Sequence, residues 1–169
     1  MSEQGKTYTT FIEAELKAER ERRTQFDARG VALVTTSGGF VTLLAAVVAL
    51  FRTGTATAAR VFPDSGIPPL VVALVALTAA AGAGIVANWN RLYAVATPVT
   101  LDRLLHDRWG VDGETVARNH VGTIQVWTID TLRRANNWKA AWISVGLAAQ
   151  LVALVALGIV VLVLLAGGA

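Results

Sequence analysis

The chain lacks cysteine and is poor in charged residues. None of its 169 residues is cysteine, which excludes disulfides, thiol catalysis and cysteine-based metal sites. Only 16% of the residues are charged, whereas 54% are hydrophobic. A soluble domain usually carries about 25% charged residues. The shortage of charge therefore indicates that part of this chain is not built for water.

Charged residues are missing from three long blocks. These are residues 31–51, the 26 residues between Asp64 and Arg91, and the last 30 residues from Ala140. A bilayer core of about 30 Å needs roughly 20 apolar helical residues, and each block reaches that length. The alternative is a set of buried helices in a soluble protein, but three such blocks would leave too little polar surface to cover them. The first block is also longer than the apolar region of a signal peptide, about 7–15 residues.

The sequence therefore predicts an all-α integral membrane protein with long helical cytoplasmic extensions. We expect transmembrane helices at 31–51, 68–90 and 141–166, an external loop at 52–67 and an external tail at 167–169. Residues 1–30 and 91–140 hold thirteen of the 15 lysines and arginines. Because loops rich in Lys and Arg stay in the cytoplasm, we predict a protein of the inner (plasma) membrane. Its N-terminus would be cytoplasmic and its C-terminus external.

The cytoplasmic parts show helix signals of their own. Thr10-Phe11-Ile12-Glu13 fits a capping box and predicts a helix from Thr10 that continues through Arg29 into the first span, with Gly30 as a candidate bend.

In the segment 91–140 we expect the second span to run on to about Thr97, where Pro98 stops it. Thr100 would then cap a short helix that ends at Gly110, and Asp112 would open a last helix that passes unbroken into the third span.

Small residues recur at steps of three and four along each predicted span. Inside lipid, helices associate through close approach at small residues, so these stripes predict a left-handed bundle; the alternative is that alanine is simply common here. The stripes are Ala32, Thr35, Gly39, Thr42, Ala46 and Ala49 in the first span, Ala73, Ala76, Ala80, Ala83 and Ala87 with Gly84 in the second, and Gly146, Ala149, Ala153 and Ala156 in the third. The residues expected to face lipid in the first span are Val34, Val41, Leu44, Val48 and Phe51.

A few polar residues lie in or beside the spans. Gln150 is predicted to bond to Thr42 or Thr78 on a partner helix, with a pore-lining role as the alternative. Asp27 and Lys139 flank the first and third spans and are predicted to form a salt bridge that leaves Arg29 for lipid phosphate. The alternative for that pair is two solvated interface charges. No ionisable residue lies within a span, which counts against a proton-coupled transporter or pump.

No catalytic constellation is evident, so we expect neither an enzyme nor a cofactor. His106 and His120 fall on different predicted helices, which does not suit a metal site. One cluster has the chemistry to hold a phosphate and stack a base, or simply to bind anionic lipid through its charge. Its members are Arg103, Arg108, Trp109, Arg118, Trp127, Arg133 and Arg134. We expect no nucleic-acid polymer as a partner.

Two stretches resemble a known family. DARGVALVTTSGGFVTLLAAVVAL resembles the start of the first span in the small transmembrane effectors of bacterial cyclic-pyrimidine anti-phage defence, the Pycsar transmembrane family. LRRANNWKAAWISVGLAAQLVALVAL resembles their final cytoplasmic helix and last span, with Asn136 and Lys139 in the matching places. Where that family often has Asp-x-Lys-Ala, this chain has Arg29 and Gly30 in the last two positions.

The resemblance implies a sensor and effector in one chain: a cyclic nucleotide binds, the protein forms a homo-oligomer, and the bilayer is compromised. The alternative from the residues alone is a structural or adaptor membrane protein that docks a cytoplasmic partner and conducts nothing.

Overall fold

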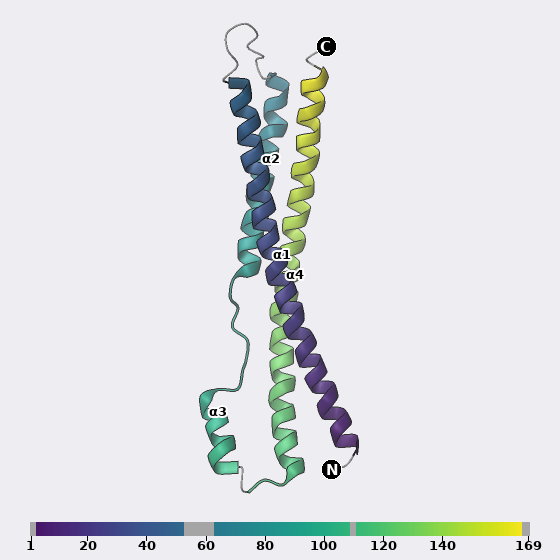
Figure 1. Ribbon diagram of the computed structural model, residues 1–169, viewed down its shortest axis with the longest axis vertical. Coiled ribbons are helices and arrows are strands. Elements are labelled where there is room, and N and C mark those ends of the chain that lie inside the picture. Colours follow the sequence, from purple (N-terminus) through teal and green to yellow (C-terminus); the bar gives the residue numbers. More distant parts are fainter. Residues whose placement is uncertain (1–2, 53–62, 109–110, 167–169) are drawn as a thin grey trace. The chain divides into compact units, whose positions relative to one another are not determined.

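The computed structural model describes residues 3–52, 63–108 and 111–166 (Figure 1). Every regular element in these ranges is helical, which confirms the predicted all-α class. The elements are α1 (Glu3–Arg52), the 3₁₀ turn η1 (Asp64–Gly66), α2 (Ile67–Asn88), α3 (Pro98–Arg103), the π-helical turn η2 (Leu104–Arg108) and α4 (Glu114–Ala166). Three of these helices are long and apolar enough to cross a membrane. The two long helices α1 and α4 run unbroken from polar sequence into apolar sequence, as predicted.

The predicted start and bend of the first helix are wrong. α1 begins at Glu3, and the Thr10 hydroxyl donates to the Lys6 carbonyl at 2.9 Å, so Thr10 is an interior residue of the helix and not its cap. Gly30 lies within an uninterrupted run of helix. Glycine permits a bend but does not enforce one, and here Gly30 is buried against Asn88 of α2.

Boundaries between the second and third long helices also differ from the prediction. α2 ends at Asn88, and the chain has no regular structure from 90 to 97. Thr97, not Thr100, caps α3, because its hydroxyl accepts the Thr100 amide at 3.2 Å. Proline holds the residue before it in an extended conformation and readily occupies the first helical position, so the break falls at Thr97. α4 begins at Glu114 instead of Asp112, and Gly110 lies outside the described residues.

The chain divides into two compact units. We call Met1–Gln25 with Asn90–Trp138 the polar unit, and Phe26–Trp89 with Lys139–Ala169 the apolar unit. Helices α1 and α4 each contribute residues to both units.

In the apolar unit, small residues of α2 and α4 form the contact faces, as predicted. The residues of the α2 stripe are all buried, and in α4 Gly146, Ala153 and Ala156 are buried while Ala149 is half-buried. Gly84 lies where α2 meets α1, since a Cβ atom added there would come within 2.8 Å of the Gly30 carbonyl oxygen. Close approach of helix backbones is therefore present at this contact.

Within the single chain, α1 does not use its predicted contact face, because it presents large residues to α2 and α4. Leu33 is only 3% exposed and fills the space over Gly146 and Ala83. Three residues expected to face lipid are partly buried instead: Val34 beside Gly84, and Val41 and Leu44 against Ala76, Leu77 and Ala153. Phe40 packs against the same cluster. The small residues Ala32, Thr35, Gly39, Thr42, Ala46 and Ala49 are all exposed. Val48 is half-buried, and the Phe51 side chain lies outside the described part of the chain.

The polar unit has a small hydrophobic core of its own. Leu16 of α1 packs with Ile129 and Leu132 of α4, and Ile12 and Tyr93 cover this cluster. The connecting segment before α3 is tied to α4 by a hydrogen bond from the Ala94 amide to the Thr131 hydroxyl at 3.1 Å.

The close contact at Gly84 gives a stability prediction. Gly84→Ala should destabilise the protein by about 1–3 kcal/mol because overpacking against a backbone oxygen cannot be relieved by a side-chain rotation. Gly82→Ala in the same helix is the matched control. It meets nothing within 4 Å and should be neutral or stabilising by up to about 1 kcal/mol through helix propensity. Thermal unfolding in detergent measures both, and equal midpoints would contradict the described packing of α1 on α2.

Candidate functional site

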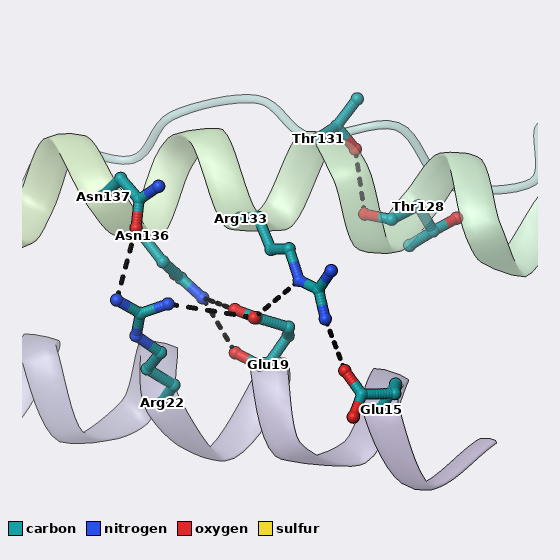
Figure 2. Close-up of polar contacts among 8 residues, drawn as sticks. All are labelled: Glu15, Glu19, Arg22, Thr128, Thr131, Arg133, Asn136 and Asn137. Carbon is teal, nitrogen blue, oxygen red and sulfur yellow. Dashed lines mark hydrogen bonds and ion pairs between the residues drawn. The ribbon is translucent and has the colours of Figure 1, made fainter. Parts of the chain in front are cut away.

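Polar side chains cross-link α1 and α4 within the polar unit (Figure 2). Their centre is Glu19, which is only 7% exposed. Its carboxylate accepts hydrogen bonds from Arg133 Nε at 3.0 Å and Asn136 Nδ2 at 2.9 Å, and Arg22 lies 3.8 Å away on the same helix. Asn136 Nδ2 also reaches the Glu19 backbone carbonyl at 2.9 Å. One carboxylate thus organises donors from both helices.

These contacts offset the free-energy cost of removing the Glu19 carboxylate from water. A buried carboxylate is tolerated only when it is paired and hydrogen-bonded, and three side chains contact that of Glu19. Asn136 is fully buried, and its Oδ1 atom has no hydrogen-bond partner in the described structure. Arg133 extends the network to Glu15, and Arg22 donates to the Asn137 side chain at 3.2 Å. The network fixes the register of α1 against α4 in this unit, since a shift would unpair several polar groups together.

The predicted ion pair between Asp27 and Lys139 is present in the apolar unit. Lys139 is 1% exposed, and its Nζ donates to Asp27 Oδ1. The Asp27 side chain remains 40% exposed, so the cation is desolvated while its partner still reaches the surface. Arg29 is exposed, and within the described ranges no ion pair is formed with it.

Gln150 contacts a partner helix, but its predicted partners are wrong. Its Nε2 donates to the Thr36 hydroxyl at 2.7 Å and lies 3.0 Å from the hydroxyl of Ser37, which is fully buried. Thr42 and Thr78 instead bond to carbonyls of their own helices. The reason is the same as for Leu33: α1 turns its Leu33–Ser37 side toward α4. The prediction that Gln150 serves packing, with a pore role as the alternative, stays open.

The structure does not gather the predicted ligand residues into one site. Arg133 belongs to the Glu19 network, Arg118 pairs with Glu114 at 2.6 Å, and Arg134 pairs with Asp130. The hydrogen bond and the charge of Asp130 raise the pKa of the Arg134 guanidinium. Trp127 is 60% exposed, and Trp109 lies outside the described residues.

Two cavities of the polar unit contain the remaining candidates. One, of about 700 Å³, lies between the first turns of α1 and α4 and is lined in part by Tyr8, Arg118 and Gln125. Gln125 Oε1 is a buried atom without a hydrogen-bond partner. The other, of about 270 Å³, is lined in part by Arg103, Arg108 and His120. Within the described ranges no group of three or more His, Cys, Asp or Glu is placed to hold a metal ion.

Sequence reasoning missed Glu19 and the role of Asn136 in binding it, although a signal was present. Both helices carry a row of buried and half-buried residues at alternating steps of four and three, the spacing of a coiled-coil seam. In α1 these are Ile12, Leu16, Glu19, Arg23, Phe26, Gly30, Leu33, Ser37, Phe40 and Leu44; in α4 they include Gln125, Ile129, Leu132, Asn136, Lys139, Ile143, Gly146, Gln150 and Ala153. Polar residues at such seam positions need hydrogen-bond partners on the other helix. The four–three spacing in the sequence therefore marks Glu19 as a candidate for such a contact.

Comparison with known proteins adds no relative: the chain matches no protein-family model, no curated protein and no solved structure.

The Glu19 network predicts an asymmetry between two glutamates of α1. Glu19→Ala removes the carboxylate that accepts from Arg133 and Asn136 and should cost about 1–3 kcal/mol of unfolding free energy, because two hydrogen bonds to a charged, buried group are lost. Glu21→Ala is the control: its only described ion pair is with Lys17 at 3.9 Å, and both side chains are exposed, so the change should stay within about 0.5 kcal/mol. Chemical unfolding in detergent compares them, and a similar loss in both would show that Glu19 is not an organising residue.

The ion pair predicts a non-additive double-mutant cycle. Asp27→Ala alone leaves the Lys139 cation buried without its partner and should cost about 3–5 kcal/mol. Adding Lys139→Met should recover much of that loss, since a buried apolar chain of similar length replaces the orphaned charge. Unfolding of the wild type, both single variants and the double variant gives the coupling. Additive effects would mean that the two groups do not stabilise each other.

Proposed function

We propose that this chain is a non-enzymatic, homo-oligomeric membrane protein of bacteria that senses a cytoplasmic signal and perturbs or gates the inner membrane in antiviral defence. The class of signal, a cyclic nucleotide, comes from the resemblance of the segments around Asp27 and Asn136–Lys139 to the Pycsar transmembrane effectors. The distribution of Lys and Arg supports a cytoplasmic N-terminus and an external C-terminus.

The observation that carries this proposal is the exposed small-residue face of α1. The equivalent faces of α2 and α4 are buried within the chain, whereas Ala32, Thr35, Gly39 and Thr42 are exposed in a helix long and apolar enough to span a bilayer. The threonine hydroxyls are satisfied by carbonyls of their own helix, so the face can approach another helix closely without orphaned polar groups. Small residues of this kind favour helix association in lipid, and a second copy supplies the helix.

The larger cavity of the polar unit supports a sensing role. Its volume of about 700 Å³ falls within the roughly 300–1,000 Å³ typical of small-molecule sites. Tyr8 and Gln125 line it, and the Arg118 guanidinium lies at its wall in an ion pair with Glu114, which lines the same cavity. An aromatic side chain beside polar and charged groups suits a planar, polar ligand.

Continuity of α1 and α4 supports coupling between sensing and response. Both helices supply residues to the polar and the apolar unit, and their pairing in the polar unit depends on the polar network around Glu19. A ligand that binds one pairing of α1 and α4 better than another shifts the population toward it, and the helix backbones carry that change into the apolar segments.

Two glycine variants separate assembly from folding. Gly39→Leu and Gly158→Leu both fill open space in the single chain, because nothing lies within 4 Å of either Cβ position. Only Gly39 lies on the exposed α1 stripe. We expect wild type and Gly158→Leu to cross-link as oligomers and to depolarise cells when cyclic UMP or cyclic CMP is supplied. Gly39→Leu should fold with an unchanged thermal-unfolding midpoint, but it should neither cross-link nor depolarise cells.

The measurements are a potential-sensitive dye in expressing cells and cross-linking in membranes. If no cyclic nucleotide collapses the membrane potential with wild type, the effector role is wrong and the adaptor role takes its place.

A further inference from the structure

We propose that the smaller cavity, formed by α3, η2 and α4, is a binding site for a phosphate-class anion: inorganic phosphate, a small phosphomonoester or a phospholipid headgroup of that kind. The site lies wholly within the polar unit and does not rest on the proposed function.

Two arginines and a histidine meet at this cavity from three different elements. Arg103 comes from α3, Arg108 from η2 and His120 from α4, and the Thr100 hydroxyl is close by. The remaining lining residues are Val99, Leu104 and Ile124. None of the described lining residues is a carboxylate. Arginine suits phosphate oxygens because its planar fork donates two parallel hydrogen bonds.

The ionisable residues that line the cavity are two arginines and a histidine, whereas the neighbouring aspartates lie outside its lining. Asp112 takes one branch of Arg108, with Oδ1 3.3 Å from NH1, and the guanidinium keeps further donors. Asp102 and His106 contact each other at 3.0 Å, and neither residue lines the cavity. Asp107 is exposed and does not line the cavity. In the described chain, Arg103 takes part in no ion pair, so its guanidinium is available to a ligand, and the His120 ring lines the same cavity.

The backbone at this place is unusual as well. Residues Leu104–Arg108 form a π-helical turn, a conformation that is rare and frequent at functional sites. Its hydrogen bonds join residues five apart, which is the spacing of Arg103 and Arg108. The π-helical turn therefore occurs where the guanidinium groups of Arg103 and Arg108 line the same cavity.

The volume of the smaller cavity limits the size of the ligand that it can hold. A volume of about 270 Å³ is below the roughly 300–1,000 Å³ typical of sites for drug-sized molecules. The cavity therefore suits a phosphate group with a small substituent, or the head of a lipid whose chains lie outside it. Its lining shares no residue with the larger cavity, so the two sites can be tested separately.

The test uses the full-length protein in a neutral detergent with inorganic phosphate as the probe. Titration calorimetry or ³¹P line broadening should show saturable binding. Arg103→Gln should weaken it by about tenfold or more, the loss expected for a charge-assisted hydrogen bond, and His120→Gln should weaken it in the same direction. Arg134→Gln is the matched control: it removes the same charge from the same unit, but its side chain is paired with Asp130, and it should change affinity by less than about twofold.

Lipid arms distinguish the two sources of phosphate. If a headgroup is the natural ligand, nanodiscs containing phosphatidic acid should displace bound phosphate in an Arg103-dependent manner, whereas pure phosphatidylcholine nanodiscs should not. If phosphatidic acid has no effect, a free phosphate or phosphomonoester is the ligand. Absence of saturable binding in both arms, or an equal loss in Arg103→Gln and Arg134→Gln, would overturn the site. Should Arg103→Gln fail to fold, the exposed His120→Gln variant decides in its place. Membrane potential is not a readout, so a failed effector function leaves this test unaffected.

Discussion

The structure depends on one constraint: a polar group removed from water must find a partner. The seam residues of α1 and α4 include Glu19, Asn136, Lys139 and Gln150, and each is held by a partner on the other helix. Apolar side chains tolerate many registers, whereas each of these bonds is formed in one register only. Buried polar residues at seam positions are well attested as determinants of register. The pairing of the two long helices is therefore specified by a few polar contacts and stabilised by the apolar ones.

Complementary size governs the rest of the apolar unit. α2 and α4 supply Ala83, Gly84 and Gly146, and α1 fills the space above them with Leu33 and Val34. Space left beside these small residues would forfeit dispersion contacts if nothing filled it. Large residues on one helix against small ones on two others solve this problem. The same solution leaves the small face of α1 to the outside.

This size complementarity explains which contacts could be predicted from the sequence and which could not. Apolar length predicted three helices able to span a bilayer, and charges beside those runs predicted the Asp27–Lys139 pair. The stripe of α1 was wrong because Ala32 and Leu33 begin two faces with the same three–four spacing, and periodicity alone does not choose between them. Glu19 and Asn136 are 117 positions apart, so no local pattern links them. Thr97 and Thr100 are both suitable caps, and only the effect of Pro98 on its predecessor separates them.

Polar seams also limit how such a bundle can change. Sliding α1 against α4 by a fraction of a turn would break the bonds of Glu19 and Asn136 before new ones form, so intermediate positions are costly and changes are stepwise. Two features lower the cost of leaving the described pairing. Asn136 Oδ1 is buried without a partner, so a pairing that supplies a donor recovers that penalty, and Asp27 remains partly exposed, so it can be solvated while it moves. The bonds at Glu19 stabilise the described pairing of α1 and α4, whereas the missing bond at Asn136 lowers the free-energy cost of leaving it.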